Sequence, residues 1–246
     1  MLLALFLIDL AAGLVLFLPL AGRRNAGVKF YRMVFLISAA LAALAAVSHA
    51  MAHARELAVI DAVPVALTLV VWLVLRYPKR LVFRVPAALL GASYLVAAVA
   101  SWRAGTDAPL PWSIAGALAS IALLGSVNLA MILGHWYLVV RGMAIDPLKR
   151  LTIATLVAGI ARAVIVAAAL CTTGVWYEIA IRQGVFFWMR AGWGLAGPLL
   201  LYPFVWGTVK IRSTMAATGI LYVDVVAVVI GEVLGGWLSA IAHVPV

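Results

Sequence analysis

The sequence predicts an all-α integral membrane protein built as a bundle of eight transmembrane helices. Of its 246 residues, 67% are apolar and 11% are charged, and the mean hydropathy is +1.18. A soluble domain is about half apolar and about a quarter charged. The apolar residues also gather in stretches of bilayer-spanning length, and most basic residues lie between these stretches. Together these observations exclude a soluble domain, a disordered chain and a nucleic-acid-binding module.

Each expected element is an apolar stretch near the length that a bilayer requires. A spanning helix needs about 20 predominantly apolar residues, and a window of about 19 residues divides the chain into eight such spans, with seven as the alternative count. The connections are short, so the whole chain forms a single polytopic transmembrane domain without a soluble domain. The predicted spans are 2–20, 33–52, 57–75, 82–101, 112–139, 151–174, 184–208 and 215–241.

The basic residues indicate the orientation. Thirteen of the eighteen lysines and arginines lie in every second connection, and cytoplasmic connections carry the excess of positive charge. Both termini are therefore expected on the non-cytoplasmic side of the cytoplasmic membrane. No basic residue precedes the first span, which we expect to stay as an uncleaved helix. The basic connections hold Arg23, Arg24, Lys29, Arg32, Arg76, Lys79, Arg80, Arg84, Arg141, Lys149, Arg150, Lys210 and Arg212, whereas the others hold Arg55, Arg103, Arg182, Glu56, Asp61, Asp107 and Glu178.

Small residues in two spans, and prolines in one of them, affect helix packing. The span 184–208 contains Pro198 and Pro203 among several glycines, and each proline removes a backbone hydrogen bond, so this span cannot be a straight helix. The break is explained either by packing or by a substrate-binding helix of the transporter kind. In the last span, Gly231 and Gly235 have the spacing that lets two helices approach closely in lipid.

Ionisable residues inside the spans are the candidate functional residues, because charge is costly in hydrocarbon. Depths at about 1.5 Å per residue place them in two layers. We expect Arg162, Asp224 and Asp9 near the midplane, and Arg190, Glu232 and His49 nearer the outer face.

Two interpretations of these layers remain open. In the first, the groups form structural ion pairs, Arg162 with Asp224 or Asp9 and Arg190 with Glu232. In the second, they form a proton or substrate path or a quinone headgroup site, in which His49 and Glu232 exchange protons with the bound carrier.

The histidines also raise the question of a metal or haem. His49 and His53 are four residues apart and share a helical face, which makes them candidates for copper or zinc, although two imidazoles lack a third strong ligand. His135 could be a single axial ligand of haem b, and Asn128 lies on the same polar face of the fifth span. A hydrogen-bonding role in the bundle is the simpler interpretation of both residues.

The sequence contains no autonomous catalytic motif, so enzymatic activity stays undecided. The first functional hypothesis is a membrane subunit of a redox or energy-transducing assembly, which offers a quinone-facing or proton-conducting surface. Its partners would be the lipid bilayer and other membrane subunits. The alternatives are a small stand-alone proton-coupled or anion transporter, with the broken seventh helix at its site, and a membrane scaffold without a ligand.

Overall fold

The described part of the chain is almost entirely helical and contains no strand. The computed structural model describes residues 1–75, 80–140 and 142–246, and for residues 80–85 it describes the backbone only. Seven helices of this part are long and apolar enough to cross a membrane, so the chain is a helical multi-pass membrane protein. These helices are α1 (Leu2–Ala21), α2 (Arg23–Met51), α3 (Arg55–Val74), α4 (Arg80–Thr106), α5 (Leu110–Val139), α6 (Asp146–Thr173) and α9 (Thr214–Ala242).

The chain between α6 and α9 is a series of shorter helices, which we call the composite segment (residues 177–210). In η1 and η2 the helix widens to π geometry, and Pro198 stands at the start of α8. The prediction that 184–208 is not a straight α-helix is confirmed, because the prolines and glycines there disrupt the regular bond pattern. The pieces are η1 (Tyr177–Arg182), α7 (Gly184–Met189), η2 (Arg190–Ala196) and α8 (Gly197–Lys210).

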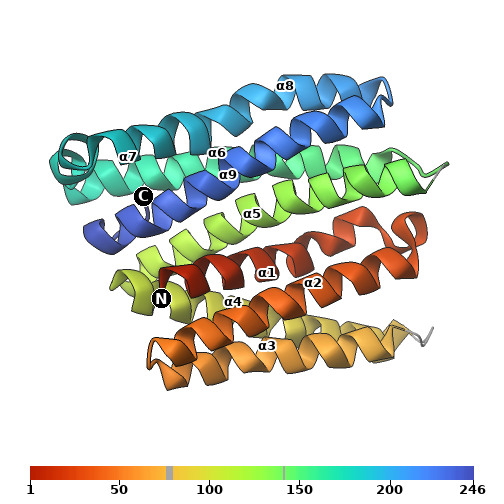
Figure 1. The fold of residues 1–246 in the computed structure, drawn as a ribbon, viewed down its shortest axis with the longest axis horizontal. Helices are drawn as coiled ribbons and strands as arrows, with labels where there is room; N and C mark the ends of the chain where they lie inside the picture. Colours follow the sequence, from red (N-terminus) through yellow and green to blue (C-terminus); the bar gives the residue numbers. More distant parts are fainter. Residues whose placement is uncertain (76–79, 141) are drawn as a thin grey trace.

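The helices form two neighbouring four-helix units. In the first unit α1, α2, α3 and α4 contact one another in a closed ring, and in the second unit α5, α6, the composite segment and α9 do the same. The units meet where α5 packs against α1 and α4 (Figure 1). Among the seven long helices, α5 is the most buried and α3 the least. The centre of the bundle is therefore α5, and its lipid-facing surface includes most of α3.

Two glycines allow the units to approach closely. A Cβ atom on Gly13 of α1 would lie 2.5 Å from the Cα of Gly125 on α5, which is too short for a real contact. The two backbones therefore touch at this crossing. Because packing rather than the hydrophobic effect holds helices together in lipid, such a crossing favours association of the two units.

The two labelled chain ends lie at one end of the bundle, which we call the terminus end (Figure 1). The α1–α2, α5–α6 and α8–α9 connections lie at the opposite end. Of the basic residues that predict the orientation, several lie at this opposite end. Arg76, Lys79 and Arg141 lie outside the described residues, and for Arg80 and Arg84 only the backbone is described.

Candidate functional site

A buried carboxylate that binds two arginines forms the centre of the candidate site. Arg162 of α6 donates from Nε and Nη2 to the two carboxylate oxygens of Glu232, each over 3.1 Å. Arg190, the first residue of η2, donates from Nη2 to Oε1 of the same carboxylate over 2.8 Å. Both arginine side chains are fully buried, and Glu232 is nearly so. Charge-assisted bonds of this bidentate kind are among the strongest that a protein makes.

Glycines make the space that Arg190 occupies. A Cβ on Gly231 would lie 3.1 Å from Nη1 of Arg190, and one on Gly235 would lie 2.8 Å from its Nε. Gly194 of η2 also lies in backbone contact with Gly231. The predicted close approach at Gly231 and Gly235 is therefore present, and its consequence is that a guanidinium packs directly on the backbone of α9 beside Glu232.

A tryptophan connects this arrangement to Asp9. Trp102 of α4 donates from its indole Nε1 to Oδ2 of Asp9 over 2.7 Å, and the guanidinium carbon of Arg162 lies 5.5 Å from the centre of the same indole ring. Trp102 fits because Gly116 faces it, where a Cβ would lie 2.6 Å from the ring. We call Asp9, Trp102, Arg162, Arg190 and Glu232 the charged cluster. It combines two cations with two carboxylates from both four-helix units.

Several polar atoms of the charged cluster lack a partner. Within the described residues, Nη1 of Arg162, Nε and Nη1 of Arg190 and Oδ1 of Asp9 are buried without a hydrogen bond. Arg162 has one further acceptor, the backbone carbonyl oxygen of Val246, at 3.4 Å. Buried polar groups normally find partners, and unsatisfied ones cluster where water or a ligand binds. The cluster therefore has hydrogen-bonding capacity beyond its internal pairs.

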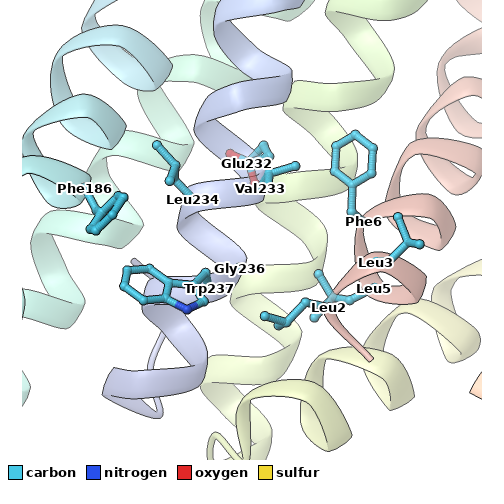
Figure 2. Close-up of a pocket in the computed structure, with 10 residues that line it drawn as sticks. All are labelled: Leu2, Leu3, Leu5, Phe6, Phe186, Glu232, Val233, Leu234, Gly236 and Trp237. Atoms are coloured by element: carbon cyan, nitrogen blue, oxygen red, sulfur yellow. The ribbon is translucent and has the colours of Figure 1, made fainter. Parts of the chain in front are cut away.

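An apolar cavity reaches the charged cluster. It has a volume of about 370 Å³ and lies between the start of α1 and the end of α9, with Phe186 of α7 at one side (Figure 2). Glu232 is the charged residue in its wall. An apolar chamber with one polar group at its wall is the usual form of a small-molecule site. The lining residues are Leu2, Leu3, Leu5, Phe6, Phe186, Glu232, Val233, Leu234, Gly236 and Trp237.

The structure corrects the predicted partner of Arg162. Its carboxylate partner is Glu232 and not Asp224 or Asp9, whereas the predicted pair of Arg190 with Glu232 is present. The reason is that α6 begins at Asp146 and not near 151, so Arg162 lies about 24 Å along its helix at about 1.5 Å per residue. Glu232 lies about 27 Å along α9, but Asp224 only about 15 Å.

Asp224 lies in a separate small cavity. It is 2% exposed, and its Oδ1 is buried without a partner within the described residues. The cavity is formed by α6, α8 and α9 and has a volume of about 10 Å³. Its lining residues are Thr152, Thr155, Leu156, Pro198, Tyr202, Val205, Leu221 and Asp224.

His49 binds a carboxylate that the sequence analysis did not select. Its Nδ1 lies 2.8 Å from Oδ2 of Asp61, and both side chains are fully buried. The assignment of Asp61 to a connection is wrong, because α3 begins at Arg55 and holds Asp61 more than a turn inside the helix. The signal that could have revealed this pair is the short α2–α3 connection, because it places the end of α2, with His49, beside the start of α3, with Asp61. His49 thus belongs to the first four-helix unit, whereas Glu232 belongs to the second.

The remaining candidates have ordinary surroundings. His53 is exposed just after α2, with a positive φ of 59°, and in the described residues no group of three or more His, Cys, Asp or Glu side chains could hold a metal. Asn128 donates to the carbonyl of Leu124 one turn earlier in α5. His135 lies on the exposed side of α5, with its Nδ1 3.5 Å from the hydroxyl of Tyr222.

Comparisons of the chain with models of protein families, with curated proteins and with solved structures found no significant match. The functional argument therefore rests on the residues and their geometry.

Proposed function

We propose that the chain crosses the cytoplasmic membrane eight times, with both termini on the non-cytoplasmic side. The composite segment runs along the bundle beside α6 and α9 (Figure 1), and this position supports its assignment as the eighth crossing. Arg23 and Arg24 at the α1–α2 connection, and Lys210 and Arg212 at the α8–α9 connection, lie opposite the terminus end. The positive-inside rule then makes that opposite end cytoplasmic.

Reporter fusions test this topology. A reporter that is active only in the cytoplasm should be active when fused after Lys79 and silent when fused after Val246. An active fusion at Val246 would show an odd number of crossings or the reverse orientation.

We propose further that the charged cluster and its cavity bind the headgroup of a membrane quinone, and that the chain is a membrane subunit of a redox or energy-transducing assembly. The observation that supports this is the position of Glu232. It lines a cavity whose other lining residues are apolar, and its carboxylate accepts hydrogen bonds from Arg162 and Arg190. The apolar walls suit an isoprenoid ligand. The one acidic residue among the lining residues, Glu232, suits a headgroup that bears hydroxyl groups.

Three residues of the charged cluster would have separate roles in the oxidation of a bound quinol. Glu232 would accept a proton from a hydroxyl of the reduced headgroup, because it is the ionisable residue among those that line the cavity. Arg162 and Arg190 would hold that carboxylate in place. The terminus end is then the face to which protons leave, and electrons would pass to a redox centre of a partner subunit.

Quinone content and binding test this proposal. The protein purified from membranes that contain ubiquinone should retain it at close to one per chain. In the emptied protein, a short-tailed ubiquinone should quench the fluorescence of Trp237, which lines the cavity. Gly236→Leu should weaken this binding at least about tenfold, because a Cβ there meets only Leu5, at 3.9 Å, and the longer side chain fills the cavity.

Glu178→Gln is the matched control for Glu232→Gln, because Glu178 forms an exposed ion pair with Arg182 at the surface. It should bind the ubiquinone normally, while Glu232→Gln should not. Wild-type protein that contains no quinone and shows no quenching would reject the proposal. An absorption spectrum with a Soret band would instead show haem.

A transporter is the second candidate, and one observation favours it. The composite segment contains two π-helical pieces, and its α8 borders the cavity of Asp224, as the discontinuous helices of transporters border their sites. Co-purification separates the two functions. A subunit should bring partner chains with it, whereas a transporter should be a monomer or a homo-oligomer.

A further inference from the structure

The cavity of Asp224 has the donor set of a small cation site. Asp224 supplies a carboxylate whose Oδ1 has no partner in the described part of the chain. Thr152 and Thr155 line the same cavity from α6, and each hydroxyl donates its hydrogen to a carbonyl one turn earlier, that of Leu148 or Leu151. A hydroxyl that has donated its hydrogen keeps lone pairs for another contact. The threonines can therefore offer oxygen atoms to a cation.

The buried charge of Asp224 also requires a neutralising partner. Asp224 is 2% exposed, and within the described residues it takes part in no ion pair, since both buried arginines bind Glu232. Glu232 lies eight residues further along α9, which is about 12 Å. An ionised carboxylate buried without a partner is strongly unfavourable, so either a cation or a proton must neutralise it.

The size of the cavity limits the occupant. A volume of about 10 Å³ accommodates about one water-sized particle. Calcium and magnesium need six or more oxygen ligands and usually more than one carboxylate or several waters, for which this cavity lacks both charge and room. One carboxylate with neutral hydroxyl oxygens fits a singly charged ion without its water shell.

We propose that Asp224, Thr152 and Thr155 bind a sodium ion between α6, α8 and α9. The site is separate from the charged cluster, and its occupation does not depend on quinone binding. Because the cavity also contains Pro198 and Tyr202 of α8, the ion would hold the composite segment against α6 and α9. Sodium would thus stabilise the part of the fold that the prolines weaken.

Equilibrium binding of radioactive sodium to the purified full-length chain in detergent tests the proposal. We expect close to one ion per chain, and a higher unfolding temperature in sodium chloride than in choline chloride at equal ionic strength. Potassium should compete at least about tenfold less well, because the cavity is small. Asp224→Asn should abolish both the binding and the sodium-dependent shift.

Two threonine variants complete the test. Thr155→Val should weaken sodium binding at least about tenfold. Thr172→Val is the matched control, because Thr172 makes the same one-turn hydrogen bond on the exposed side of α6 and should bind sodium normally. The proposal is wrong if wild-type protein binds no radioactive sodium and unfolds at the same temperature in both salts. In that case Asp224 is protonated or a water molecule fills the cavity. That result stands whether or not Asp224→Asn folds.

Discussion

Gly194 of η2 and Gly231 of α9 lie in backbone contact, since a Cβ on either residue would lie 2.4 Å from the Cα of the other. This crossing brings Arg190, four residues before Gly194, against α9. There its guanidinium meets Glu232. The irregular composite segment is therefore coupled to the charged cluster through two residues that carry no side chain.

The first prediction concerns this crossing. Gly231→Ala should destabilise the protein by about 1–3 kcal/mol, because the added methyl group must separate two touching backbones. Gly219→Ala on the same helix is the control, since nothing lies within 4 Å of its Cβ position. It should be neutral or stabilise the helix by up to about 1 kcal/mol. Unfolding of both variants in detergent micelles measures the difference, and equal stabilities would contradict the crossing.

The second prediction concerns the carboxylate that binds both arginines. Glu232→Leu leaves two buried guanidinium groups without a carboxylate and should cost about 3–5 kcal/mol of stability. Arg162→Leu should cost less, because Arg190 still pairs with Glu232. The measurement is the free energy of unfolding of each variant.

A double-mutant cycle identifies the partner of Arg162. The changes Arg162→Leu and Glu232→Leu should show a coupling energy of about 0.5–3 kcal/mol, whereas Arg162→Leu and Asp224→Leu should add within about 0.5 kcal/mol. If Arg162 instead shows a coupling energy with Asp224 and none with Glu232, the pair of Arg162 with Asp224 expected from helix depth is correct and the observed pair with Glu232 is wrong.

The third prediction concerns the buried pair in the first four-helix unit. Asp61→Leu should cost about 3–5 kcal/mol, because it removes the partner of the fully buried His49. Adding His49→Phe should recover part of that loss. The exposed Glu56, which lies in the first turn of the same helix, supplies the control Glu56→Leu. If Asp61→Leu is no more damaging than Glu56→Leu, the pair contributes nothing to the fold.

The fourth prediction tests the link from Asp9 to the charged cluster. Trp102→Phe removes the indole N–H that Asp9 accepts and should cost about 1–3 kcal/mol by leaving a buried acceptor unpaired. Trp72→Phe is matched, because the indole nitrogen of Trp72 is buried without a partner in the described residues. Thermal unfolding compares the two. A larger loss for Trp72→Phe would mean that the bond to Asp9 is not important.

The amino-acid pattern predicted the positions of three helices closely, whereas α2 and α6 begin ten and five residues before the expected spans 33–52 and 151–174. The spans expected at 2–20, 112–139 and 215–241 agree with α1, α5 and α9 to within three residues at each end. The interruption of the seventh span was also foreseen, because proline removes a backbone donor wherever the helix lies. Both features depend on properties of neighbouring residues, namely their hydrophobicity and their backbone hydrogen-bonding groups, and these can be read directly from the sequence.

The pair of Arg190 with Glu232 was predicted correctly, but the partner of Arg162 was not. Helix depth placed Arg162 with Asp224, but an early start of α6 raised it to the level of Glu232, and a shift of five residues is about 7.5 Å along a helix. Asp61 was counted with a connection although it lies within the span expected at 57–75, and its pairing with His49 depends on how α2 and α3 pack against each other.

By itself the sequence determined that this chain is a helical membrane protein, where most of its helices run and that Asp9, Arg162, Arg190, Asp224 and Glu232 lie inside helices, because hydrophobicity and backbone propensity act within each segment. Only the tertiary structure decided which charges meet. Pairing depends on the rotation, tilt and offset of neighbouring helices, and backbone contacts such as Gly13–Gly125 and Gly194–Gly231 between residues distant in sequence bring these helices together.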